Sequence, residues 1–339
     1  MNWFILAVLC LLFWGAADLF YKKGTDENDR YSHLRIAVWV GLVMGVCALI
    51  LLACPAGWFP EEMKSEYSPS FLLVNAAKYA PASLAYIVSM VIGYAGLRYL
   101  EVSIISPVQN ASGAFSMIAM LIFFAFTGTV NDDLGDFSPL NIAGTVLIVA
   151  GLVALAVTES RLARKEAEKA AKTPEEKRRD RKYRFGALAL LFPILYCVFD
   201  TVGTAADGII LDEDTGLGLG EIDVLILYGL TFLVAGIGAW LFLLIQTKRP
   251  YNPFRKREIL NKGVAALFEE GGQVFYVFAM AAKPLLAAPM IASYCVVSLI
   301  LSHIFLKEKL KAAQYAAVAA VIAGIVMLGI MEGIGETEA

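Results

Sequence analysis

Two acidic residues, Asp18 and Asp200, stand in the middle of segments that are otherwise almost entirely apolar. A carboxylate near the centre of a bilayer costs about 2.5–3.5 kcal/mol or more unless it faces a polar cavity. Each aspartate also follows an aromatic residue, Trp14 or Tyr196, by one helical turn. Two acids in matching positions predict two similar halves around a hydrated site, which indicates a carrier.

Further polar residues extend the site on the predicted helix around Asp200. Tyr196, Asp200, Thr204 and Asp207 follow one another at spacings that place them on one continuous helix face. Asp200 lies deep in the apolar segment and is the predicted functional carboxylate. Asp207 lies near the end of the segment, where an interfacial position is the simpler interpretation.

A second acidic group lies in a later segment. Glu269 shares a helix face with Gln273 and Tyr276, whereas the adjacent Glu270 points about 100° away. Glu269 is therefore the predicted cavity residue, and Glu270 is expected to pair with another helix. The two glycines that follow permit either close helix packing or a local break.

Polar and aromatic residues of other segments are candidate cavity walls. Gln109 and Ser112 form a stripe after Pro107 that suits hydrogen bonding to a polar solute, although such residues also join helices to one another. Trp14 and Tyr294, with other tyrosines, could bind flat or cationic ligands by stacking, although packing explains each of them singly.

The composition excludes an ordinary soluble protein. The chain has 339 residues, 59% of them hydrophobic, and a mean hydropathy of +0.67. Apolar runs long enough to cross a bilayer recur along it and predict an all-α membrane protein with ten transmembrane helices. They span residues 3–21, 32–54, 80–98, 102–128, 139–158, 185–209, 222–246, 260–281, 285–306 and 311–331.

Several kinds of site receive no support from the sequence. The five cysteines have no paired spacing and the two histidines have no neighbouring ligands, so neither a disulfide framework nor a metal site is predicted. No phosphate-binding loop or hydrolase motif occurs, so no cofactor and no enzymatic activity are expected.

Positive charge is distributed unevenly between the loops. All lysines and arginines except Lys64, Lys78 and Lys283 fall after the odd-numbered predicted helices. The positive-inside rule therefore places both termini outside and the charged linker 160–184 in the cytoplasm. Acidic residues alternate with the basic ones in this linker, which favours a solvated helix near lipid headgroups over nucleic-acid binding.

The offset of 182 residues that relates Asp18 to Asp200 also relates Pro107 to Pro289. Five helices per half is an odd number, so the second half must be inverted relative to the first. The predicted halves are residues 1–159 and 185–339. Each proline lies about one turn into its helix, where it is a candidate hinge.

The chain resembles the EamA-type branch of the drug/metabolite transporter superfamily. The resemblance rests on Phe13-Trp14-Gly15, on the closing stretch Phe305 to Leu310, and on the small-residue-rich helix that follows. It implies transport of small metabolites through a cavity lined by helices 1, 3, 4, 6, 8 and 9. Family members usually have both termini in the cytoplasm, which is opposite to the orientation that the charges predict.

These features predict a secondary transporter of the cell membrane that moves a small neutral or cationic metabolite by alternating access. Asp18, Asp200 and Glu269 would bind a proton or a cationic group in alternation, because buried carboxylates exchange protons near neutral pH. Anionic substrates would require buried cations, which the apolar segments lack. The alternative is a passive channel or a lipid-handling, flippase-like protein. The oligomeric state, a homodimer included, is left open.

Overall fold

The computed structural model describes the chain except for residues 1, 27, 61–62, 129–137, 171–185, 213–215, 308–309 and 339. Throughout this described part the chain forms helices and no strand, so the predicted all-α membrane fold is confirmed. The long helices are α1 (Trp3–Gly24), α2 (Ser32–Ala53), α3 (Pro69–Gly96), α5 (Ser112–Thr127), α7 (Pro139–Ala170), α10 (Leu191–Ile210), α11 (Glu221–Thr247), α13 (Val264–Ala282) and α16 (Ala312–Glu338). The shorter ones are η1 (Ala56–Trp58), α4 (Val102–Asn110), η2 (Gly186–Leu190), α12 (Lys256–Glu258), η3 (Ile259–Gly263), α14 (Pro284–Ala292), α15 (Tyr294–Leu301) and η4 (Ser302–Leu306).

Among the described residues, 9 helical segments are long and apolar enough to cross a membrane, where the sequence predicts ten. The remaining predicted span is α13, which packs along α1 inside the bundle. Its hydropathy is lowered by Glu269, Glu270 and Gln273. The predicted span that is less apolar than the others is thus the one that carries the second acidic group.

The charged linker differs from its predicted start at residue 160. The helix α7 continues to Ala170, so the first part of the predicted linker extends this helix. Residues 171–184 of the linker lie outside the described part of the chain.

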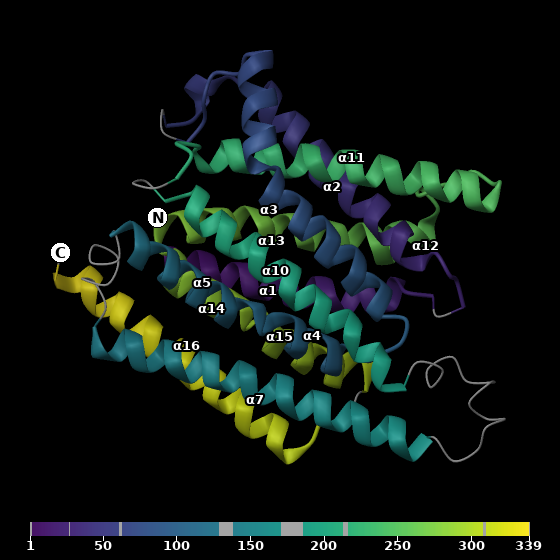
Figure 1. Ribbon diagram of the computed structural model, residues 1–339, viewed down its shortest axis with the longest axis vertical. Helices are drawn as coiled ribbons and strands as arrows, with labels where there is room; N and C mark the ends of the chain where they lie inside the picture. The colour runs from purple at the N-terminus through teal and green to yellow at the C-terminus, as the bar shows by residue number, and fades with distance from the viewer. Residues whose placement is uncertain are drawn as a thin grey trace.

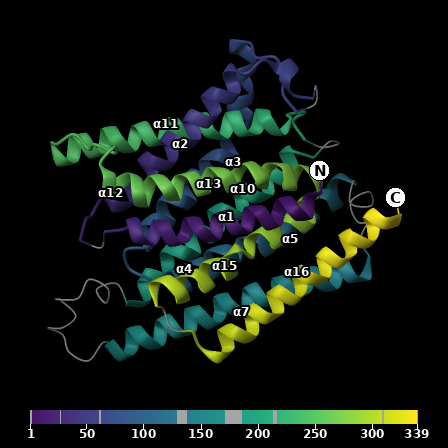
Figure 2. The ribbon, with the colours of Figure 1, turned by 180° about the vertical axis from the view of Figure 1, so that it is seen from behind.

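The helices pack in pairs that each join the first half of the sequence to the second. The closest pairs are α1 with α13, α3 with α10, α2 with α11 and α7 with α16. Figure 1 shows α2 and α11 at one edge of the bundle and α7 and α16 at the opposite edge, with the other helices between them. The two chain ends lie on the same side, as Figure 2 also shows. We call this the termini side and the opposite side, where α7 ends, the linker side.

Glycines bring the helices of both edge pairs into backbone contact. A Cβ on Gly41 of α2 would lie 2.7 Å from the Cα of Gly236 in α11. A Cβ on Gly324 of α16 would lie 2.6 Å from the carbonyl oxygen of Gly144 in α7. Small residues permit this close approach, which supplies the packing that holds helices together in lipid.

Two central helices are broken at corresponding positions. The break between α4 and α5 is at Ala111, and the break between α14 and α15 is at Ser293, again 182 residues later. Each break follows a proline of the same helix, Pro107 or Pro289, by one turn. The halves cross, because α4 packs against α15 and α5 against α14. The breaks therefore meet near the middle of the bundle.

Candidate functional site

A small cavity of about 40 Å³ lies between the central helices. Its lining includes eight of the residues predicted from the sequence: Trp14, Ser112, Tyr196, Asp200, Glu269, Gln273, Tyr276 and Tyr294. The other lining residues are Tyr86, Met90, Asn110, Gly113, Thr204, Tyr228, Ala288, Ile291 and Ala292. These residues come from the six helices that the family resemblance implies and, through Tyr228, from α11 as well.

The cavity is acidic. Asp200 of α10 and Glu269 of α13 both line it, and none of its described lining residues is Lys or Arg. The hydroxyl of Ser112 donates a hydrogen bond of 2.6 Å to Oδ2 of Asp200. The side chain of Gln273 is 2% exposed, and its Nε2 has no hydrogen-bond partner. The site therefore offers two acidic groups and an unused amide donor to whatever enters it.

Asp18 and Gln109 lie in other places than the sequence analysis expected, since neither lines this cavity. Oδ2 of Asp18 accepts hydrogen bonds of 2.6 Å from both Ser106 of α4 and Ser298 of α15. Gln109 is buried with its Nε2 unpartnered, next to Gly93 of α3. Asp18 thus joins three helices on the linker side of the cavity.

Glycines of facing helices receive the large aromatic rings of the cavity. A Cβ on Gly272 of α13 would lie 2.2 Å from Cδ1 of Trp14, whose indole N–H donates a hydrogen bond of 3.1 Å to the carbonyl oxygen of Glu269. The helix α13 is continuous here, so its glycine pair serves close packing rather than a break.

The helices α3 and α10 show the same packing twice, because each contributes a tyrosine ring that packs on a glycine of the other. Tyr86 of α3 packs on Gly203 of α10, at 3.0 Å from the position of an added Cβ. Tyr196 of α10 packs on Gly93 of α3, at 2.7 Å. The ring positions are therefore set by glycines that the sequence analysis did not single out.

A line of hydroxyl groups continues from the cavity toward the termini side. The hydroxyl groups of Tyr86 and Tyr276 lie 2.7 Å apart, and the Tyr86 hydroxyl donates to Oγ1 of Thr204 at 3.2 Å. The sequence places Thr204 on the helix face of Asp200, but neither Thr204 nor Tyr86 is among the predicted site residues. Tyr228 was missed because its segment is apolar on all sides.

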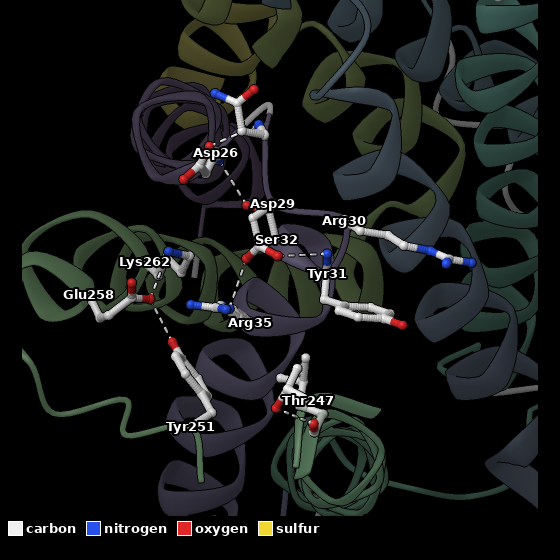
Figure 3. A network of polar contacts seen from close by, with 12 residues as sticks. Asp26, Asp29, Arg30, Tyr31, Ser32, Arg35, Thr247, Tyr251, Glu258 and Lys262 are labelled. Atoms are coloured by element: carbon white, nitrogen blue, oxygen red, sulfur yellow. Dashed lines mark hydrogen bonds and ion pairs between the residues drawn. The ribbon is translucent and has the colours of Figure 1, made fainter. Parts of the chain in front are cut away.

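A polar cluster lies on the linker side, near the start of α2, the end of α11 and the start of α13 (Figure 3). Glu258 accepts hydrogen bonds of 2.7 Å from Lys262 and 2.6 Å from Tyr251, and Arg35 pairs with Asp29 at 2.9 Å. Partial burial alone would raise the pKa of Glu258. The hydrogen bonds from Lys262 and Tyr251 and the charges of Lys262 and Arg35 outweigh burial, so this pKa lies below its ordinary value. The cluster joins the ends of α2, α11 and α13.

A loop contact closes part of the termini side. Asp223, in the first turn of α11, accepts hydrogen bonds from the backbone N–H of Ser65 at 3.0 Å, from the Ser65 hydroxyl at 2.7 Å, and from the Tyr67 hydroxyl. The backbone N–H of Ile222 donates to the carbonyl oxygen of Met63 at 3.0 Å. The loop before α3 is therefore held against the start of α11.

Comparisons with known proteins agree with this architecture. Residues 215–330 match the model of the EamA-like transporter family. A solved structure described as "Crystal structure of protein" is 14% identical, covers 98% of this chain and 98% of its own, and has a TM-score of 0.52, which shows a shared fold. No curated protein matches the chain.

Proposed function

Since the chain is a membrane transporter of the drug/metabolite transporter superfamily, with its EamA-like match in the second half, we propose that it carries a small neutral or cationic metabolite. The observation that carries the proposal is that Asp200 and Glu269 face one cavity whose described lining residues include no Lys or Arg. A buried carboxylate without a cation is costly unless it holds a proton or a cationic ligand. An amine, an amino acid or a nucleobase-like compound would satisfy these acids and the amide of Gln273.

The mechanism follows from competition for the acidic groups. A proton and a cationic group of the substrate would occupy Asp200 and Glu269 in alternation, so the entry of one favours release of the other. Asp18 would take part indirectly or at another stage, because its hydrogen bonds in this structure are to serines on two other helices. The transporter would then be proton-coupled or an exchanger.

Alternating access is supported by the closed state of the cavity. Its volume of about 40 Å³ is far below the roughly 300–1,000 Å³ of pockets that bind small molecules. The helices must therefore separate to admit a substrate. Two halves, residues 1–159 and 185–339, would rock about the central site. Support comes from the helix pairs that each join one half to the other, and from the breaks at Ala111 and Ser293.

The orientation proposed from the charge bias places the termini side outside the cell and the linker side in the cytoplasm of a plasma-membrane protein. In a variant whose five native cysteines are replaced by alanine, a cysteine introduced by Ala170→Cys should resist an impermeant thiol reagent in intact cells and react after permeabilisation. Ready labelling in intact cells would reverse the assignment.

Ligand screening tests the substrate class. Purified protein would be heated with a library of amines, amino acids, nucleobases, carboxylates and phosphates at several pH values, because selective binding raises apparent stability by mass action. We expect amines or neutral polar compounds to raise the Tm of the wild type but not of Asp200→Asn. Stabilisation by phosphates alone, unchanged in Asp200→Asn, would contradict the proposal.

A counterflow assay separates the carrier from the alternative of a passive channel or lipid-handling protein. Vesicles loaded with a compound selected by the screen should accumulate its labelled form transiently and saturably. A channel would equilibrate the two pools without accumulation.

A further inference from the structure

Asp207 of α10 is the most deeply buried acid of the central helices that the proposed mechanism does not use. Its side chain is 0% exposed. The hydroxyl of Tyr79, also 0% exposed, donates a hydrogen bond of 2.9 Å to Oδ1, while Oδ2 has no hydrogen-bond partner. Asp207 does not line the cavity, and its burial shows that it is not exposed at the surface of the bundle.

No positive charge faces this carboxyl group among the described residues. The groups that interact with it are hydroxyls and one acid, contributed by the helices packed around it: Tyr79 and Tyr86 of α3, Tyr228 of α11, Tyr276 of α13 and Asp200 of α10 itself. A fully buried carboxylate with a single hydrogen bond and no cation carries a large desolvation cost. A proton on Oδ2 removes the charge and leaves Oδ1 as the acceptor for Tyr79.

The position of Asp207 links two spaces of the molecule. One turn before it lies Thr204, which lines the cavity. One turn after it lie Ile210 and Leu211, which line a larger recess of about 590 Å³ on the termini side. At 1.5 Å per residue, each space begins about 5 Å along the helix from Asp207.

A tight contact lies next to Asp207, on the face of α10 toward α5 and α14. A Cβ on the neighbouring Gly208 would lie 2.2 Å from Sδ of Met120 in α5, 3.2 Å from Cβ of Pro284 in α14 and 3.3 Å from Cε of Met280 in α13. On the cavity side, the hydroxyls of Thr204, Tyr86 and Tyr276 lie between Asp207 and Asp200. The recess is lined by residues of α10, α11 and α13, and the last two of these helices also pack around Asp207 through Tyr228 and Tyr276. A small separation of α10 from α11 and α13 would therefore open Asp207 to the recess.

We propose that Asp207 is a second proton-binding site, placed between the cavity and the recess on the termini side. In the closed state it holds a proton on Oδ2. When α10 separates from α11 and α13, the proton exchanges with water of the recess. This proposal rests on the proposed function and extends it, because the coupling proton would bind at a site separate from the substrate.

Infrared spectroscopy of the purified protein in lipid nanodiscs tests this site without any substrate. A protonated carboxyl group has a C=O band that a carboxylate lacks. We expect Asp207→Asn to remove one such band at pH 7. We expect Tyr79→Phe to keep this band and shift it to higher wavenumber, because the C=O loses its hydrogen bond.

Glu270→Gln is the matched control, since Glu270 is an acid of the neighbouring helix α13 that lies outside the cavity lining. It should leave the band assigned to Asp207 unchanged. If Asp207→Asn fails to fold, the shift in Tyr79→Phe decides. The proposal is overturned if the difference spectrum between the wild type and Asp207→Asn shows loss of a carboxylate band instead of a protonated carboxyl band. It is also overturned if Tyr79→Phe leaves the carboxyl C=O band at the same wavenumber. A band that disappears when sodium replaces choline in the buffer overturns it as well, since this would show a sodium site.

This readout is independent of the substrate screen. If no amine or neutral polar compound stabilises the protein but the infrared bands behave as expected, the proposed substrate class is wrong and the proton site remains supported. If the screen succeeds but the infrared bands do not behave as expected, the proton site is wrong and the transport function remains supported.

Discussion

The two aspartates that correspond in sequence, Asp18 and Asp200, have different surroundings in the structure. Asp18 accepts two serine hydrogen bonds and lies outside the cavity, whereas Asp200 accepts one from Ser112 and faces it. Asp18 therefore connects three helices, whereas Asp200 faces the cavity in which we propose that a ligand binds.

The sequence contains the cause of this difference. The offset of 182 relates Ser106, a donor to Asp18, to Ala288, which has no hydroxyl. The same offset relates Ser298 to Ser116, whose hydroxyl donates to the carbonyl oxygen of Ser112 at 2.8 Å instead of to Asp200. Loss of one hydroxyl and redirection of another leave Asp200 with capacity to bind further partners.

The largest expected effect comes from Asp200→Asn. The amide keeps the shape of the side chain and can still accept from Ser112, so the protein should fold. Removing the acid from the cavity should reduce transport of the screened compound to background and flatten its pH dependence. Uptake into proteoliposomes at several pH values measures both, with Glu270→Gln as the control. Normal transport with an unchanged pH profile would remove Asp200 from the mechanism.

Asp18→Asn should have a smaller effect, on the order of tenfold or less in transport rate, equivalent to about 1.4 kcal/mol. Its amide oxygen can accept from both serines, so the joint between α1, α4 and α15 persists in weaker form. The swap of Ser106→Ala with Ala288→Ser sharpens the comparison, because it exchanges the hydroxyls of the two sites. If the swap leaves the two aspartate variants with unchanged relative effects, the serines do not cause the difference.

Replacing either candidate hinge proline, Pro107 or Pro289, by alanine tests whether both halves move. A restored backbone hydrogen bond should stiffen the helix, so exchange should slow several-fold while binding, measured by the Tm shift, stays nearly constant. Equal loss of rate and binding, or no loss in either variant, would make these prolines packing features only.

Gly272→Ala should disturb the cavity wall while sparing both aspartates. The added Cβ would clash with Trp14, and overpacking of this kind costs about 1–3 kcal/mol. A lower Tm together with weaker binding is expected. The control is Gly238→Ala in α11, where an added Cβ meets no atom within 4 Å. Equal Tm values for the two variants would show that the wall accommodates the clash.

The smallest effect is expected from Glu258→Gln at the polar cluster of the linker side. Since the pKa of Glu258 lies below its ordinary 4.5, its stabilising contribution is complete above that value and is lost as the pH falls through the lower native value. Acid unfolding of the wild type below this pH should therefore be steeper than that of the variant. The difference should be below about 1 kcal/mol, because Glu258 is only partly buried. A larger loss of stability at pH 7 would show that the cluster supports more of the bundle than the ends of these helices.

The sequence predicts the fold well, because spanning helices must be long and apolar and leave a strong signal. It also predicts the acids and most aromatic residues of the cavity, because a polar group in such a segment is conspicuous. It placed Asp18 in the cavity because the offset with Asp200 was taken to imply equal roles. The role of Ser106 and Ser298 could not be predicted, since a serine in a helix bundle has many alternative partners. Likewise, burial of Asp207 depends on Tyr79, from a helix more than a hundred residues earlier.

The reciprocal packing of α3 and α10 restricts how the two helices can move. In each helix the tyrosine and the glycine that receives its partner's ring are seven residues apart, which is about 10.5 Å. The rings of Tyr86 and Tyr196 thus occupy the spaces left by Gly203 and Gly93. Sliding one helix along the other would press both rings against residues that carry a Cβ. Opening of the cavity therefore has to begin by lifting or tilting α10 away from α3, so that both tyrosine rings move away from the facing glycines at the same time.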